Sequence, residues 1–253
     1  MANSRLDHML VTRGLAPDLD RARALILAGR VHGPAQRYAA PGLSLPLGTK
    51  IQVKPDREFV SRGGLKLAAG LDAWEIDVQG LTCIDLGAST GGFTDCLLQR
   101  GAARVYAVDV GYGQLADSLR RDERVVAMER TDARALPSLD PRLDPPPTLA
   151  VVDLAFISLR EALGPLAAVL PPRAPVLALV KPQFEAPRES VPQDGVVRSP
   201  QIRAAAVRSV ALWALERGWR LGGIRRSPLR GPKGNEEFLV WLRTPTSAEQ
   251  AVT

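Results

Sequence analysis

One stretch, residues 82–99, constrains the fold of this chain more than any other. It reads TCIDLGASTGGFTDCLLQ: an apolar run ending at Leu86, a glycine-rich turn from Gly87 to Gly92, and a segment from Phe93 that suits a helix. Strand, glycine turn and helix form the first unit of a nucleotide-binding α/β sheet. Glycines let the backbone approach a ligand, and the helix N-terminus offers free N–H groups. The stretch therefore predicts an α/β domain with a ligand site at this turn.

The glycine spacing narrows the choice of ligand. A dinucleotide turn has the pattern G-x-G-x-x-G, whereas Ser89 stands here in place of the second glycine, which counts against NAD. A P-loop is also disfavoured, because no Gly-Lys-Ser/Thr follows. A second apolar run, RVYAVDV, contains Asp109, 24 residues after Asp85, where such folds place a carboxylate on ribose hydroxyls. A turn that only joins a strand to a helix is the alternative.

Apolar runs and helical segments alternate through the rest of the chain. The clearest helix is predicted from Gln201 to Arg217, with Ser199 as its cap and Pro200 at its start. This alternation predicts a mostly parallel, doubly wound sheet. Its seven candidate strands are 82–86, 104–110, 124–128, 148–154, 175–181, 219–225 and 236–242.

Charged residues follow three of these strands. Asp132 comes after the third, Asp153 ends the fourth, and Lys181 ends the fifth. Ligands bind beyond the carboxyl ends of strands in open α/β sheets, so we expect these side chains to gather there. Lys181 follows four apolar residues, and partial desolvation favours a neutral amine that Asp153 can hold in place. A structural Asp–Lys ion pair and a plain loop acid at Asp132 are the alternatives.

The first 54 residues differ in charge from the rest of the chain. They contain eight Lys and Arg residues against three Asp residues, and so carry most of the net charge of +6. A basic module beside a nearly neutral body points to an anionic polymer as partner, with a solvated surface as the alternative. Helical spacing predicts two short helices, one stopped by Gly14 and one capped by Asp18 or Asp20.

Several motifs in this module resemble the S4 RNA-binding domain. They are R-L-D-x-x-L from Arg5, R-G-L-A from Arg13, R-A-x-x-L-I-x-A-G-x-V from Arg21, and the later Pro41-Gly42. The resemblance implies a small α+β module whose outward arginines follow RNA phosphates, contacts that position the RNA without reading its sequence. The arginines expected to bind RNA are Arg5, Arg13, Arg21, Arg23 and Arg30.

Further motifs extend the resemblance to nearly the whole chain. The glycine turn, D-x-G-x-x-x-G-G, resembles motif I of S-adenosylmethionine-dependent methyltransferases. S-R-G-G-x-K-L at 61–67, V-K-P-Q-F-E at 180–185 and G-N-x-E-F at 234–238 complete the pattern. Together they resemble the TlyA-type (hemolysin A-like) ribosomal RNA 2′-O-methyltransferases, whose catalytic domain is of the FtsJ type. The resemblance implies a Rossmann-like methyltransferase fold with a seven-stranded sheet, and methylation of cytidine in 16S or 23S rRNA.

The resemblance also implies a set of site residues. The catalytic set falls on Lys66, Asp153, Lys181 and Glu237. The S-adenosyl-L-methionine site falls on Asp85, Gly87, Ala88, Ser89, Gly91, Gly92, Phe93, Asp109 and Asp132. The expected parts are an S4 domain at 1–54, a charged linker at 55–62, a methyltransferase domain at 63–243, and a frayed tail at 244–253.

Composition argues against other classes of protein. Cys83 and Cys96 and the two histidines lack ligand spacing, so no metal site is expected. No run of 18 apolar residues is present, which favours a cytoplasmic protein without a membrane partner. A non-catalytic RNA-binding or ribosome-assembly factor and a membrane-active hemolysin-type protein are the alternative functions.

Overall fold

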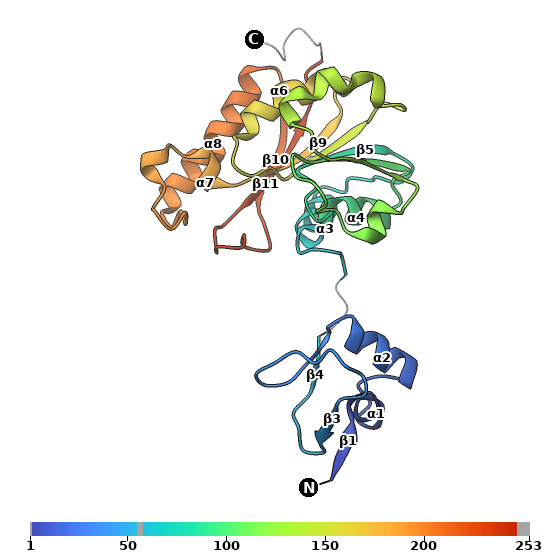
Figure 1. Cartoon of the computed structure of the whole chain (residues 1–253). Helices are drawn as coiled ribbons and strands as arrows, with labels where there is room; N and C mark the ends of the chain where they lie inside the picture. The colour runs from blue at the N-terminus through green and yellow to red at the C-terminus, as the bar shows by residue number, and fades with distance from the viewer. Residues whose placement is uncertain (1, 55–57, 247–253) are drawn as a thin grey trace. The chain divides into compact units, whose positions relative to one another are not determined.

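The computed structural model describes residues 2–54 and 58–246, and each of these two stretches forms a compact unit (Figure 1). The boundary between the units corrects the predicted linker. Phe59 is buried in the core of the second unit, and the backbone N–H of Val60 donates to Asp95 at 2.7 Å, so residues 58–62 belong to that unit. Residues 55–57 lie outside the described residues.

The first unit packs two helices on two short antiparallel ribbons. Its core contains Leu6, Leu10, Leu25 and Ile26 of the two helices, and Tyr38 of the segment between β2 and β3. Strand β1 pairs with β3, and β2 pairs with β4. The elements are β1 Asn3–Arg5, α1 Leu6–Thr12, α2 Leu19–Leu27, β2 Val31–His32, β3 Ser44–Pro46 and β4 Gln52–Val53. Of the two predicted caps for the second helix, Asp18 is the one used, accepting from the backbone N–H of Arg21 at 2.7 Å.

The second unit is built on one seven-stranded sheet of order β10-β11-β9-β8-β5-β6-β7. Strands β9, β8, β5, β6 and β7 are parallel, whereas β11 is antiparallel to both of its neighbours. The predicted doubly wound sheet is confirmed, and each predicted strand forms with ends within two residues of those expected. The strands are β5 Thr82–Leu86, β6 Arg104–Val108, β7 Val125–Met128, β8 Leu149–Val152, β9 Pro175–Val180, β10 Arg220–Arg226 and β11 Phe238–Arg243.

Helices cover both faces of this sheet (Figure 1). The side chains of α3, α4 and α5 share one apolar core with Cys83, Val105 and Leu177, and those of α6 and α8 share another with Ile84 and Val240. This alternation follows from the strand period of two. The helices are α3 Gly63–Ala73, α4 Gly92–Gln99, α5 Asp117–Arg120, η1 Ala133–Arg142, α6 Leu159–Val169, α7 Pro182–Glu185, η2 Arg188–Ser190 and α8 Pro200–Glu216.

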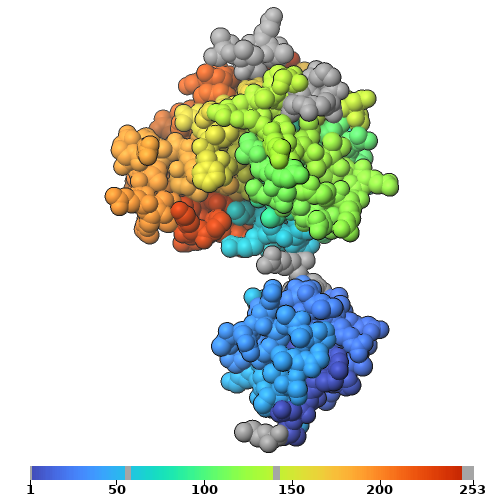
Figure 2. Space-filling model, viewed as in Figure 1, coloured from blue at the N-terminus to red at the C-terminus, as the bar shows by residue number. Residues whose placement is uncertain are grey.

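Two segments close the second unit around the sheet. Thr244 is buried, and its hydroxyl donates to the carbonyl of Pro171 at 2.7 Å, so the predicted tail begins later than 244. Residues 247–253 of that tail lie outside the described residues. The loop 227–237, red in Figure 2, lies at the surface near cyan residues from the beginning of the second unit. There the guanidinium of Arg62 donates to the carbonyl of Arg230 at 2.9 Å.

The beginning of α3 is packed through Gly64. A Cβ at this position would overlap the ring of Phe59, which is buried. We predict that Gly64→Ala lowers the free energy of unfolding by about 1–3 kcal/mol, because the ring must leave its site. The neighbouring Gly63→Ala is the control, since its Cβ would come no closer than 3.3 Å to any atom. Urea unfolding measures both variants, and equal stabilities would contradict this packing.

Candidate active site

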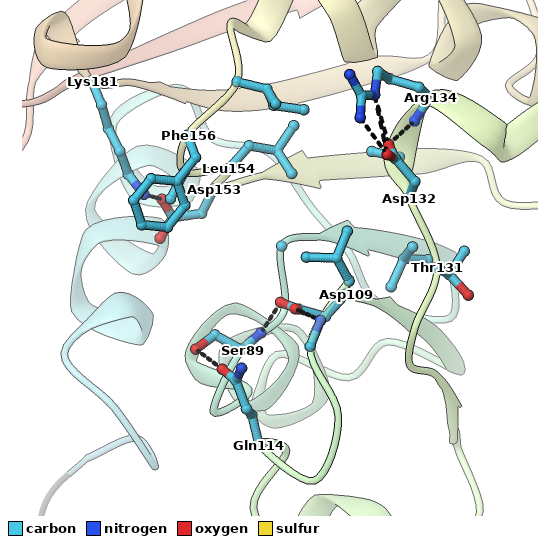
Figure 3. Close-up of a pocket in the computed structure, with 17 residues that line it drawn as sticks. Ser89, Asp109, Gln114, Thr131, Asp132, Arg134, Asp153, Leu154, Phe156 and Lys181 are labelled. Atoms are coloured by element: carbon cyan, nitrogen blue, oxygen red, sulfur yellow. Dashed lines mark hydrogen bonds and ion pairs between the residues drawn. The ribbon is translucent and has the colours of Figure 1, made fainter.

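A cavity of about 510 Å³ lies at the carboxyl ends of the parallel strands (Figure 3). The glycine turn after β5 forms one wall, and the segments after β6, β7, β8 and β9 form the others. Four residues of the predicted cofactor site line it: Gly87, Ser89, Asp109 and Asp132. The catalytic candidates Asp153 and Lys181 line it as well. The expectation that these side chains gather at one sheet edge is therefore confirmed.

Asp109 joins two backbone turns at this cavity. Its carboxylate accepts from the backbone N–H of Ser89 at 2.8 Å and from that of Gly111 at 2.7 Å (Figure 3). The Ser89 hydroxyl lies 3.2 Å from the side-chain oxygen of Gln114, which also lines the cavity. A carboxylate has about four lone-pair sites, so Asp109 retains acceptor capacity for a ligand.

The backbone at Gly87 comes close to β8. Its φ of +84° is in the left-handed region, and a Cβ there would lie 2.6 Å from the carbonyl oxygen of Asp153. Only glycine meets both requirements without strain. Gly87 thus lets the glycine turn pack against Asp153. This contact brings the predicted cofactor residues of the turn next to the predicted catalytic residue Asp153.

The other predicted cofactor residues do not line this cavity. A Cβ on Gly91 would overlap the side chain of Leu119, and one on Gly92 would overlap that of Ser61. The buried Ala88 and Phe93 pack in the core with α3 and α5. These residues shape the turn and the helix that follows it.

Asp85 is also placed behind the cavity. It is fully buried on β5, where its Oδ2 accepts from the hydroxyl of Thr94 at 2.7 Å. Its Oδ1 has no hydrogen-bond partner among the described residues. The pKa of Asp85 is raised to about 7, chiefly by burial; the hydrogen bond from Thr94 opposes this rise and the charge of Asp153 adds to it. Asp85 is placed to support the turn rather than to contact a ligand.

Asp132 lies on the cavity wall but is already paired. The guanidinium of Arg134 donates to its carboxylate at 2.6 Å, and this contact lowers the pKa of Asp132 (Figure 3). Neither side chain is buried, because Asp132 is 37% exposed and Arg134 is 52% exposed. A ligand at this wall of the cavity would therefore meet the Asp132 carboxylate, which Arg134 holds in place.

The four catalytic candidates form two separate ion pairs. Lys181 Nζ lies 2.7 Å from Asp153 Oδ1, and Lys66 Nζ lies 2.5 Å from Glu237 Oε2. The second pair is almost fully buried, with side chains 8% and 1% exposed, whereas Lys181 and Asp153 are 14% and 20% exposed. The more accessible lysine is therefore Lys181.

A second cavity of about 430 Å³ adjoins the first. Glu237, Asn235 and Lys233 line it, and it shares Ala155, Phe156 and Lys181 with the first cavity. Lys181 thus lies where the two cavities meet. One cavity can hold a group donor and the other an acceptor, with a carboxylate-held amine between them.

A comparison with known proteins identifies the family. Residues 59–244 match the FtsJ-like methyltransferase family. The chain belongs to the FtsJ-like methyltransferase family. The resemblance stated from the sequence is thereby confirmed for the catalytic domain.

Relatives that span the whole chain extend this result. The 16S/23S rRNA (cytidine-2′-O)-methyltransferase TlyA of Mycobacterium tuberculosis is 48% identical over 96% of this chain and 91% of its own length. Hemolysin A of Brachyspira hyodysenteriae is 34% identical over 93% of this chain and 98% of its own. A solved structure of a candidate hemolysin from Streptococcus thermophilus superposes with a TM-score of 0.73 at 39% identity, covering 98% of this chain and 90% of that one. The TlyA-type, hemolysin A-like relationship is confirmed.

Two residues of this FtsJ-like methyltransferase were missed as site residues by sequence reasoning. Phe156 is 89% exposed, and its backbone has a positive φ of 72°. Its ring lies 5.4 Å from that of Phe184, measured between ring centroids. Asn235 is buried, and its side chain bridges the carbonyl of Gly195 and the backbone N–H of Val197. The sequence offered one signal for each of them. Phe156 is an aromatic residue three places after Asp153, and Asn235 is the asparagine of the G-N-x-E motif.

Glu185 explains the end of the P-Q-F-E motif. It is buried, and it accepts from the hydroxyl of Ser158 at 2.6 Å and from the backbone N–H of Leu159 at 2.7 Å. Desolvation raises the pKa of this carboxyl. The contact ties the end of α7 to the beginning of α6 and thereby fixes the chain just after Lys181 and just after Phe156.

The predicted RNA-binding arginines are partly engaged within the first unit. Arg5 and Arg23 both contact the buried carboxylate of Asp7, at 2.7 and 3.3 Å, and the Arg5 contact holds the pKa of Asp7 well below its usual range. Arg13 donates to the carbonyls of Leu47 and Thr49, and Arg30 donates to that of Lys54. Arg21 lies in the first turn of α2, where its backbone N–H donates to the cap residue Asp18.

Within residues 2–54 and 58–246, no helix combines the length and apolar character needed to cross a membrane. The same residues contain no group of three or more His, Cys, Asp and Glu side chains arranged to hold a metal ion.

The buried Asp85 predicts a pH dependence of stability. Its folded-state pKa of about 7 exceeds the unfolded value of about 3.9, so the folded chain binds the extra proton between these values. Relative to Asp85→Asn, which cannot titrate, the wild type loses stability as pH rises from about 4 to about 7, by up to about 1.4 kcal/mol per unit. Urea unfolding of both proteins across this range measures the difference. A difference that does not change with pH would contradict the assignment.

Proposed function

We propose that this chain is an S-adenosyl-L-methionine-dependent methyltransferase that modifies the ribose 2′-hydroxyl of cytidine in 16S rRNA, 23S rRNA or both. The observation that carries the proposal is the position of Lys181, held by Asp153 at the junction of two cavities. The activity named for the TlyA relative supports the substrate. Ribosomal RNA as substrate implies a cytoplasmic enzyme.

The first cavity suits this cofactor. Its walls carry the carboxylates of Asp109, Asp132 and Asp153, which complement hydroxyl, amine and sulfonium groups. Val110, an apolar residue that is 68% exposed, offers a surface for a flat ring. When bound, S-adenosyl-L-methionine supplies a methyl group activated by its positively charged sulfur.

The chain's own residues would prepare the ribose hydroxyl in the second cavity. Lys181, in its neutral form, would accept the 2′-hydroxyl proton on Nζ as the oxygen forms its bond to the methyl carbon and the carbon–sulfur bond breaks. Asp153 would orient the amine. Lys66, fixed by Glu237, adds a positive charge that stabilises charge developing on the oxygen. In-line alignment of oxygen and methyl carbon would supply much of the rate.

Phe156 supports a nucleic acid substrate. Its exposed ring lies on the wall shared by both cavities, and Figure 3 shows it in front of the Lys181–Asp153 contact. Unstacked RNA bases stack on such aromatic side chains, at about 1–3 kcal/mol per base. A base drawn out of its helix would place its ribose near Lys181.

The first unit would bind RNA as an S4 domain. Its basic charge and two short helices are suited to contacts with phosphates. Arg5 and Arg23 also hold Asp7, so they serve the fold of the unit as well. The unit would position the ribosomal RNA, leaving the chemistry to the second unit.

Mass spectrometry of rRNA nucleosides tests the reaction. Incubation of rRNA with the protein and isotope-labelled S-adenosyl-L-methionine should yield labelled 2′-O-methylcytidine. Label on a base would contradict ribose methylation. No label despite bound cofactor would contradict the enzyme and favour a non-catalytic RNA-binding or ribosome-assembly factor.

Lys181→Arg tests the proton acceptor. Arginine keeps the positive charge but cannot lose a proton near pH 7. We expect methyl transfer to fall by roughly two to four orders of magnitude, as for other general bases. Calorimetry should show that the cofactor still binds, which controls for folding. Methyl transfer near the wild-type rate would make Lys181 only a structural partner of Asp153.

A double variant, Arg13→Gln with Arg21→Gln, tests the first unit. It leaves the two arginines that hold Asp7 in place. If each arginine contacts a phosphate, the slope of log affinity for rRNA against log salt concentration should fall by about two. Thermal unfolding provides the control for structure. An unchanged slope would remove these arginines from the RNA interface.

A further inference from the structure

Three arginines converge on one carboxylate next to the catalytic Glu237. Glu236 is only 11% exposed, and its carboxylate lies 3.0 Å from Arg230, 3.3 Å from Arg203 and 3.9 Å from Arg226. The arginines come from three different elements: α8, the end of β10 and the loop 227–237. We call these four residues the Glu236 cluster.

The cluster lies at the active-site edge of the sheet. Strand β11 is antiparallel to β9, and Phe238 pairs with both Val180 and Arg226. Val180 immediately precedes Lys181, so the end of β10 lies at the same sheet edge as the catalytic lysine. Consecutive residues of an extended chain point to opposite sides, and accordingly Glu237 pairs with Lys66 of α3 while Glu236 faces α8.

The cluster keeps an excess of positive charge at the surface. Three guanidinium groups share one carboxylate, and each guanidinium has five N–H donors. Arg203 is largely buried, at 17% exposed, but Arg226 and Arg230 are 66% and 63% exposed. Arg230 is hydrogen-bonded to Glu236, Arg226 lies within ion-pair distance of it, and both guanidinium groups reach solvent, where such groups bind phosphate oxygens.

The surrounding loop connects this cluster to the second cavity. Lys233 and Glu237 of the same segment line that cavity. The loop is held on both sides, because Arg62 donates to the carbonyl of Arg230 and Asn235 bridges Gly195 and Val197. A polymer whose ribose enters the second cavity would continue across this loop.

We propose that Arg226 and Arg230 form a phosphate-binding subsite for the RNA strand adjacent to the target nucleotide. Arg203 and Glu236 are the positioning residues of this subsite. The proposal rests on the proposed function, since it takes RNA as the polymer that reaches the cavity. Its role is to add affinity for the strand next to the target nucleotide without reading the base.

The variant Arg226→Gln with Arg230→Gln tests the subsite in the full chain. The KM for rRNA should rise roughly tenfold or more, and the salt slope of rRNA binding should fall by about two. The rate at saturating rRNA and the KM for S-adenosyl-L-methionine should not change, because neither arginine lines the first cavity.

A matched control removes the same charge elsewhere. Arg220→Gln with Arg243→Gln removes two exposed arginines that pair with each other across β10 and β11, at the opposite end of these strands from Arg226. This variant should keep the wild-type KM and salt slope. If both double variants raised the KM for rRNA and lowered the salt slope equally, the loss of positive charge alone would explain the result, and the subsite would be overturned.

Glu236→Gln tests positioning. It adds one positive charge to the cluster, yet the KM for rRNA should rise because the arginines lose their shared anchor. A lower or unchanged KM would overturn the positioning role.

Failure of the subsite can be told apart from failure of the proposed function. If the wild type methylates rRNA, and the variant Arg226→Gln with Arg230→Gln has the same KM for rRNA and the same salt slope as the wild type, only the subsite fails. If the wild type transfers no methyl group, the proposed function fails, and the salt slope of binding still tests the subsite.

Discussion

The buried ion pair between Lys66 and Glu237 ties the start of the second unit to its end. The two residues are 171 positions apart, and the contact joins α3 to the segment before β11. Removal of one partner from such a pair typically costs about 3–5 kcal/mol, because an unpaired charge is left buried. The pair therefore specifies how α3 and β11 meet, and so where the wall of the second cavity stands.

The two lysine–carboxylate pairs differ in ways that suit different tasks. Lys66 and Glu237 are almost excluded from water, whereas Lys181 and Asp153 lie at the junction of the cavities. A buried, fixed charge suits electrostatic stabilisation, and an accessible amine suits proton transfer. The glycine turn supports both tasks, since Gly87 brings the cofactor side against Asp153.

Much of the fold and part of the site could be predicted because they depend on local patterns. Apolar runs of strand length indicated all seven strands of the second unit, and residues at their carboxyl ends had to share one edge of a parallel sheet. That is why Asp109, Asp132, Asp153 and Lys181 line one cavity. The linker was misjudged at 58–62 because the burial of Phe59 depends on contacts with α3 and α4.

The sequence by itself determined the order of strands and helices along the chain, the glycine turn, and the charged residues that follow the strands. Tertiary structure decided which residues of the turn line the cavity, because Leu119 and Ser61 approach Gly91 and Gly92 from distant elements. It also decided the surroundings of Glu236 and Glu237, which meet α8 on one face of the sheet and α3 on the other. Motifs specify backbone conformation locally, whereas exposure and charge pairing depend on side chains far away in the sequence.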